Sequence, residues 1–137
     1  MQSSVKLKSR ITNALHLPDS YRDDLTTLKN EIMLQITELK KSIVEKSPKD
    51  VISDKLLKIC ELASEILVHS RKPPFNESYK PTMINEIEWK EYVIDGCEEV
   101  VTSLEILQTN HQTNKSITSK LDEFSENLNL LLSLILG

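Results

Sequence analysis

The stretch that decides the fold is Ile117–Leu136, with the sequence ITSKLDEFSENLNLLLSLIL. Its apolar residues recur at intervals of four, three, four, three and four: Ile117, Leu121, Phe124, Leu128, Leu131 and Ile135. This alternation is the heptad repeat, which places apolar side chains along one side of a helix. The spacing predicts a helix over 116–136 that packs against other helices in a coiled-coil-like manner.

The second half of this helix is apolar on nearly every side, because Leu130, Leu132, Leu134 and Leu136 join the repeat. A helix that is apolar all round must be surrounded by other protein. We predict that one small bundle cannot enclose so many leucines at a fraying end, and that the helix enters the core of a partner or of a second copy. The predicted partner-binding residues are Leu121, Phe124, Leu128, Leu131, Leu132 and Ile135. The alternative is a central helix of the chain's own bundle.

Proline divides the rest of the chain into periodic segments. All five prolines, at 18, 48, 73, 74 and 81, fall between segments, as expected from the cost of about 3 kcal/mol for proline inside a helix. The predicted helices before 116–136 are 4–16, 19–46, 48–70 and 83–108, with a loop over 71–82. We therefore predict a single all-α domain over 1–137, a bundle of about four to five antiparallel helices with coiled-coil-like heptad packing and a long C-terminal helix.

The first two long segments each carry an apolar stripe at helical spacing. In 19–46 the stripe is Tyr21, Leu25, Leu28, Ile32, Ile36, Leu39 and Ile43, and we expect Met33 and Leu34 to broaden it. In 48–70 it is Ile52, Leu56, Ile59, Ala63 and Ile66, flanked by Leu57, Cys60, Leu62 and Leu67. Ser47 is the expected N-cap, with Pro48 at the first helical position. The short connection predicts antiparallel neighbours.

The segment 83–108 has a less regular pattern. Its expected inward residues are Ile84, Ile87, Ile94, Cys97, Val101 and Leu104. Asp95-Gly96 is a hairpin signal, but helical spacing continues on both sides, so we expect Gly96 to allow a close helix crossing instead. Residues 108–116 lack apolar side chains, which indicates either a break or a solvated part of one long helix.

Composition narrows the class of protein. The 137 residues are 39% hydrophobic and 28% charged, with 4% aromatic residues and two glycines, a composition typical of a globular helical chain rather than a sheet. The net charge of -4 argues against direct binding of nucleic acid. No apolar run is long enough to predict a membrane span.

The N-terminal residues are locally basic. Lys6, Lys8 and Arg10 precede the first acid, Asp19, a pattern that also occurs in mitochondrial presequences. We favour a first helix of the bundle. A further hypothesis combines these charges with Lys40 and Lys41 to bind nucleic acid or a membrane surface.

The sequence offers few candidates for catalytic, metal-binding or cofactor-binding residues. His16, His69 and His111 have no metal-ligand spacing, and Cys60 and Cys97 are expected to be reduced core thiols of an intracellular protein. We interpret the Glu98-Glu99 pair as part of a solvated helix face and find no glycine-rich phosphate loop. The sequence predicts no catalytic, cofactor-binding or metal-binding residues, no cofactor and no small-molecule substrate.

Binding to other proteins therefore remains as the predicted basis of function. The leading hypothesis is a non-catalytic scaffold subunit that co-packs its helices with other helical subunits, in a hetero-oligomer by preference or a homodimer as the alternative. By class analogy we expect a nuclear assembly such as a transcription coactivator or kinetochore complex, with cytoplasmic and mitochondrial locations as alternatives. The other hypothesis is a self-sufficient regulatory adaptor that binds peptide helices in trafficking or signalling.

Overall fold

The computed structural model describes residues 19–71 and 89–136, and this part of the chain is helical throughout apart from two short turns. The elements are α2 (Asp19–Val44), α3 (Lys49–Arg71), a π-helical turn η1 (Trp89–Val93) that leads into α5 (Ile94–Gln112), and α6 (Thr118–Leu136). The predicted helix 4–16, nearly all of the loop 71–82 and the first residues of the predicted helix 83–108 lie outside the described residues.

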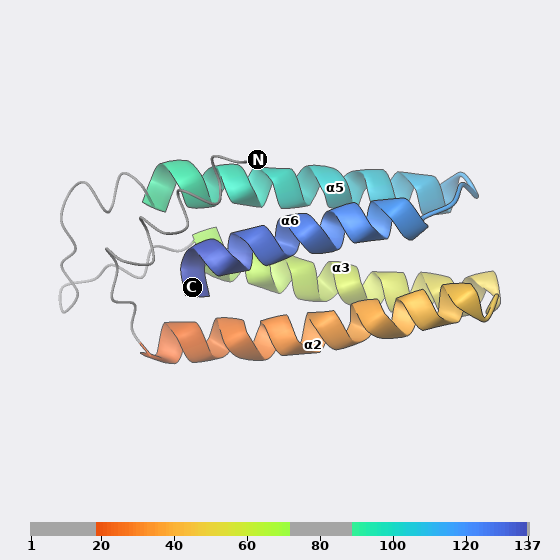
Figure 1. Cartoon of the computed structure of the whole chain (residues 1–137), viewed down its shortest axis with the longest axis horizontal. Helices are drawn as coiled ribbons and strands as arrows, with labels where there is room; N and C mark the ends of the chain where they lie inside the picture. The colour runs from red at the N-terminus through yellow and green to blue at the C-terminus, as the bar shows by residue number, and fades with distance from the viewer. Residues whose placement is uncertain (1–18, 72–88, 137) are drawn as a thin grey trace.

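The four α-helices run alternately up and down, so that sequence neighbours are antiparallel (Figure 1). α2 packs on α3 and α6, while α5 packs on α6 and α3. Each helix thus has two neighbours around one shared interior, as short connections favour. For residues 19–71 and 89–136, the prediction of an all-α chain whose helices pack together is confirmed.

The interior is built from the apolar stripes of all four helices. The largest fully buried side chains are Phe124, Leu25, Ile32, Leu39, Ile59, Ile66, Leu107, Leu121, Leu128 and Leu131. In α3 the whole predicted stripe is buried, and in α2 only Leu28 and Ile43 are partly exposed. The periodicity of 3.6 residues therefore located the inward faces of these two helices correctly.

Two leucines that were expected to widen these faces lie outside instead. Leu34 of α2 is 56% exposed and Leu57 of α3 is 59% exposed. Among the described helices, α2 packs mainly on α3 and α6, and α3 packs mainly on α2 and α5, so one side of each helix faces solvent. The prediction that Leu34 and Leu57 flank the core is wrong.

α5 is a continuous helix through Asp95 and Gly96, which rules out the hairpin. A Cβ added at Gly96 would lie 3.1 Å from Leu131 Cδ1, so the expected close helix crossing is confirmed. The inward residues are Val93, Cys97, Val100, Leu104 and Leu107, whereas Ile94 and Val101 are only partly buried. The expected stripe was rotated relative to the true one because the segment has apolar residues on two sides.

The break between the last two helices lies later than the polar composition suggested. α5 continues to Gln112, and the chain turns over 113–117 with Asn114 in the left-handed region at φ 58. The two helices are therefore separate. Asparagine is one of the few residues other than glycine that adopts this conformation readily.

The turn between α2 and α3 also differs in detail from expectation. α2 ends at Val44, and Lys46 has a left-handed φ of 55. The carbonyl oxygen of Pro48 accepts hydrogen bonds from the backbone N–H groups of Val51 and Ile52, at 3.0 and 3.2 Å. Pro48 therefore precedes the first residue of α3, and the prediction of Ser47 as N-cap is wrong by one position.

Within the described residues, no helix is both long enough and apolar enough to cross a lipid bilayer. The longest helix, α2, has 26 residues, but charged residues recur along its whole length. α6 ends in leucines, and its polar first half shortens the apolar part.

Candidate partner-binding grooves

The six predicted partner-binding residues lie in the interior of the chain's own bundle. Leu121, Phe124, Leu128 and Leu132 are 0% exposed, Leu131 is 1% exposed and Ile135 is 3% exposed. The premise that this small chain cannot shelter them is wrong, and the alternative of a central packed helix describes α6 correctly. None of the six offers surface to a partner that docks on the folded bundle.

Two features explain why the apolar end of α6 is enclosed. α6 contacts α5, α2 and η1, so neighbours cover it on several sides. Its last turn is also tied to α2, because Arg22 Nη2 donates a hydrogen bond of 2.9 Å to the carbonyl oxygen of Leu136. A cation at the end of a helix satisfies a carbonyl that has no partner within the helix. The expectation of a fraying end did not allow for this contact.

The surface open to a partner includes a groove between α5 and α6, which we call the acidic groove. Its lining residues are Asp95, Glu98, Glu99, Thr102, Ser103, Ile106, Glu123 and Asn127. Four of these carry carboxylates and none is a lysine or arginine. Ile106 is 39% exposed and supplies apolar surface within the groove. The groove therefore combines negative charge with a small apolar contact area.

The helices themselves reinforce this charge. α5 contains no lysine or arginine over its 19 residues. Within the described residues, the one ion pair of a groove carboxylate joins Glu123 Oε2 to Lys120 Nζ at 3.5 Å, and both groups are partly exposed. Unpaired carboxylates on one side of a hairpin produce a negative potential that extends about 10 Å at moderate salt.

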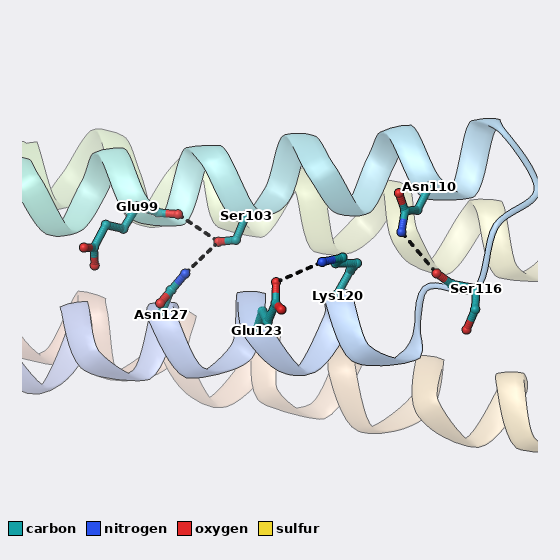
Figure 2. A network of polar contacts seen from close by, with 7 residues as sticks. All are labelled: Glu99, Ser103, Asn110, Ser116, Lys120, Glu123 and Asn127. Atoms are coloured by element: carbon teal, nitrogen blue, oxygen red, sulfur yellow. Dashed lines mark hydrogen bonds and ion pairs between the residues drawn. The ribbon is translucent and has the colours of Figure 1, made fainter. Parts of the chain in front are cut away.

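The floor of the groove is rigid and polar. Figure 2 shows Ser103 on α5 and Asn127 on α6 facing each other across the helix interface. Asn127 Nδ2 donates to Ser103 Oγ at 3.2 Å, and Ser103 Oγ donates to the carbonyl oxygen of Glu99 at 2.8 Å. Ser103 is 6% exposed, so this chain of hydrogen bonds is largely shielded from water. It links α5 to α6 at the floor of the groove.

A second groove lies between α2 and α3. It is lined by Asp24, Thr27, Leu28, Ser64, Glu65, Val68 and His69. Its edge is stabilised by the Tyr21 ring, which stacks on His69 with 4.6 Å between ring centroids, and Tyr21 Oη donates to the His69 carbonyl oxygen at 3.1 Å. Two carboxylates line this groove instead of four, so its charge is less one-sided.

The two histidines among the described residues, His69 and His111, make contacts between helices. His69 stacks on Tyr21, and His111 Nε2 lies 2.7 Å from Ser53 Oγ on α3. His111 lies in the last turn of α5. Both thiols are free. Cys97 is buried, whereas Cys60 is partly exposed.

Burial raises the pKa of the Cys60 thiol above its ordinary value, and a hydrogen bond from Gln108 opposes part of that shift. The contact joins Gln108 Nε2 to Cys60 Sγ at 3.1 Å. A raised pKa lowers the thiolate fraction at neutral pH and with it the reactivity of the sulfur. The described residues include no group of three or more His, Cys, Asp or Glu side chains placed to hold a metal ion.

The acidic groove was only partly visible in the sequence. Glu98-Glu99 stood out as a pair, and the structure places both carboxylates in the groove lining. Glu123 and Asn127 come from a different helix, so no local pattern connects them to α5. The one signal that could have pointed to this surface is the absence of lysine and arginine from 94–112.

Comparisons with known proteins gave no relative: no protein-family model, no curated protein and no solved structure matches the chain.

Proposed function

We propose that this chain is a self-sufficient helical adaptor that binds a basic amphipathic helix of a partner in the acidic groove between α5 and α6. The observation that carries the proposal is the contrast between the apolar residues of α6 and the groove carboxylates. The six apolar residues first predicted to bind a partner are buried in the bundle. The four groove carboxylates lie at the surface, and no lysine or arginine is among the lining residues. The adaptor hypothesis is therefore favoured over co-folding with other subunits.

The chemistry of the groove defines the partner. A helix lying along α5 and α6 could direct an apolar side chain to Ile106 and lysine or arginine side chains to Asp95, Glu98 and Glu123. Complementary charge accelerates encounter and rejects acidic partners. Since the carboxylates are partly exposed, their contribution falls as salt is raised.

Binding of a synthetic amphipathic helix tests this proposal. The probe is a peptide of leucine and lysine with one apolar face, and a version with glutamate in place of lysine is the negative probe. The variant Glu98→Gln/Glu99→Gln should weaken binding about tenfold, since it removes two of four attractive charges. The matched control is Glu31→Gln/Glu61→Gln, which removes two exposed carboxylates on α2 and α3 and should leave binding nearly unchanged. Equal losses in the two variants would show that the peptide senses only net charge.

A stable multiprotein complex, including a nuclear assembly of the coactivator or kinetochore type, is the second candidate function. It is favoured by exposed apolar side chains on the outer sides of α2 and α3, where Leu34, Leu57 and Val68 are each more than half exposed. Within either proposal, we infer that the heptad spacing of α6 produces coiled-coil-like packing among the chain's own helices.

The solution mass of the isolated chain distinguishes the two functions. The adaptor proposal expects a monomer by light scattering and one cooperative thermal transition at a concentration-independent temperature. The complex-subunit proposal expects self-association or poor folding of the chain alone, because its partner surface is uncovered. A melting temperature that rises with protein concentration would count against the adaptor.

A further inference from the structure

The two interhelical turns among the described residues lie at the same end of the bundle. α2 ends and α3 begins at this end, and α5 ends and α6 begins at the same end (Figure 1). The turn over 45–48 and the turn over 113–117 therefore come from distant parts of the sequence but share one surface. A pocket between them is lined by residues from both turns.

This pocket has the opposite charge character to the acidic groove. Its polar lining includes Lys46, Lys49, Lys115 and His111, together with the hydroxyl groups of Ser116 and Thr118. No carboxylate is among its lining residues. Three lysines, two from the turns and one from the first position of α3, thus line one pocket, although the chain as a whole carries a net charge of -4. Such local reversal of charge favours an anion over a cation at this end of the bundle.

Contacts across the pocket hold the two turns together. Lys49 Nζ donates to Asn114 Oδ1 at 2.6 Å, which joins the start of α3 to the second turn. Ser53 Oγ and His111 Nε2 are 2.7 Å apart and join α3 to the end of α5. Asn110 Nδ2 donates to the Ser116 carbonyl oxygen at 3.2 Å, as Figure 2 shows. The cationic side chains therefore extend from a braced backbone, which reduces the entropy lost when a ligand binds.

The ends of α3 and α6 add to this positive character. Pro48 and Ile117 precede the two helices, and neither has a side-chain oxygen that could accept a first-turn N–H. The positive ends of both helix dipoles therefore lie at this end of the molecule, where an anion is stabilised. The nearest acids by sequence are Glu45, beside Lys46, and Asp50, in the first turn of α3. Neither lines the pocket.

We propose that this pocket, the turn pocket, binds the phosphate group of a small phosphomonoester. Lysine ammonium groups and serine or threonine hydroxyls are donors that suit the acceptor oxygens of a dianionic phosphate. Lys46 and Lys115 come from different turns and Lys49 from the start of α3, and all three line the pocket. The site is independent of the acidic groove, so failure of either proposal leaves the other standing.

Titration of the full chain with inorganic phosphate and with glycerol 3-phosphate tests the site. Amide chemical shifts are followed by NMR at constant ionic strength, with sodium chloride as the reference salt. Phosphate should produce saturable shifts confined to residues of the two turns, and glycerol 3-phosphate should produce the same pattern. Shifts that are as large with chloride, or that spread over all exposed lysines, would overturn the proposal.

A pair of triple variants makes the assignment to this pocket specific. Lys46→Gln/Lys49→Gln/Lys115→Gln should weaken phosphate binding by about tenfold or more, because charge-assisted hydrogen bonds are lost. The control Lys29→Gln/Lys41→Gln/Lys58→Gln changes the net charge equally at lysines outside the pocket and should bind as the wild type does. Circular dichroism verifies that both variants are folded. Equal weakening in the two would overturn the proposal.

Discussion

The two hairpins share one architecture but differ in what they expose. The N-terminal hairpin (α2 and α3) leaves five large apolar side chains exposed: Leu34, Val44, Val51, Leu57 and Val68. In the C-terminal hairpin (α5 and α6), Ile106 is the one such residue among those described. Yet α6 has the most apolar sequence of the four helices. The difference shows that the position of a leucine around the bundle, and not local hydrophobicity, decides whether it reaches solvent.

The two hairpins also differ in charge, and here the C-terminal hairpin is the one with the unbalanced surface. Residues 19–71 carry ten acidic and nine basic side chains, whereas residues 94–136 carry seven acidic and two basic ones. The N-terminal hairpin can therefore pair its charges, as Lys55 and Glu38 do across the helices at 3.9 Å. The C-terminal hairpin has too few cations to do so, and only Asp122 and Glu123 of its carboxylates form ion pairs among the described residues. Apolar and acidic surfaces are thus segregated to different hairpins.

The largest expected effect is the loss of stability when a charge is placed at a buried leucine instead of an exposed one. Leu128→Asp places a carboxylate at a fully buried site and should destabilise the bundle by about 4 kcal/mol or more, enough to unfold a small domain. Leu57→Asp is the matched control, because its side chain is 59% exposed, and should change stability by less than about 0.5 kcal/mol. Urea denaturation followed by circular dichroism measures both. Similar losses in the two variants would contradict this assignment of the core.

A smaller effect concerns the close approach of α5 and α6 at Gly96. Gly96→Val should destabilise the protein by about 2 kcal/mol, since its branched side chain meets Leu131 in the packed interior. Gly96→Ala should lie within about 1 kcal/mol of the wild type, because the gain in helix propensity offsets a contact of 3.1 Å with a side-chain tip. Thermal melts compare the two. If valine were tolerated as well as alanine, the helices would not be in close contact there.

The hydrogen bond of Tyr21 in the N-terminal hairpin is expected to contribute less to stability than the packing at Gly96. Tyr21→Phe removes the hydrogen bond to the His69 carbonyl oxygen and should cost about 1 kcal/mol at neutral pH. Tyr92→Phe is the control, since the Tyr92 hydroxyl has no hydrogen-bond partner among the described residues. Urea titrations at pH 7 determine both values. An equal cost for the two substitutions would argue against a role for the Tyr21 hydroxyl.

The same residue makes stability depend on alkaline pH. Burial, and to a lesser extent the charge of Cys97, raise the pKa of Tyr21 above its ordinary value of 10.0. The unfolded chain therefore loses this proton first, so the stabilisation is fully present below pH 10 and is lost as pH rises further. The free energy of unfolding should fall less steeply above pH 10 in Tyr21→Phe than in the wild type. Parallel profiles would contradict the raised pKa.

The smallest expected effect concerns a contact between the hairpins. Lys40 Nζ on α2 and Asp122 Oδ1 on α6 are 2.9 Å apart, with side chains 45% and 60% exposed. Exposed ion pairs contribute little, so Lys40→Ala should cost no more than about 0.5 kcal/mol. A double-mutant cycle with Asp122→Ala isolates the pair, and its coupling should shrink further in 1 M salt. Coupling above about 1 kcal/mol would show that this pair helps to orient the hairpins.

Much of the fold was predictable because helical periodicity is a local property. The inward residues of α2, α3 and α6 follow from intervals of three and four, and the position of Pro48 marks the turn between α2 and α3. Prediction failed where apolar residues lay on two sides of a helix, as with Leu34, Leu57 and Val101. Periodicity cannot decide between two apolar faces, since that choice depends on which neighbours are present.

The candidate sites were less predictable than the core. Glu98 and Glu99 are adjacent in sequence and stood out, but Glu123 joins them only because α6 folds back along α5. Lys46 and Lys115 lie 69 positions apart in the chain and line one pocket because both turns fall at the same end. A site assembled from separate turns leaves no spacing that a motif could capture.

The sequence by itself determined that this chain forms amphipathic helices, where most of them begin and end, and which residues of α6 are buried, because these depend on backbone propensity and on a repeat of 3.6 residues. Only the tertiary structure decided whether the leucines of α6 are buried in the chain's own bundle or in the core of a partner. Two hairpins packed side by side enclose them, while four carboxylates remain on one outer face and three lysines at one end. That outcome depends on contacts between helices far apart in sequence, which no local pattern encodes.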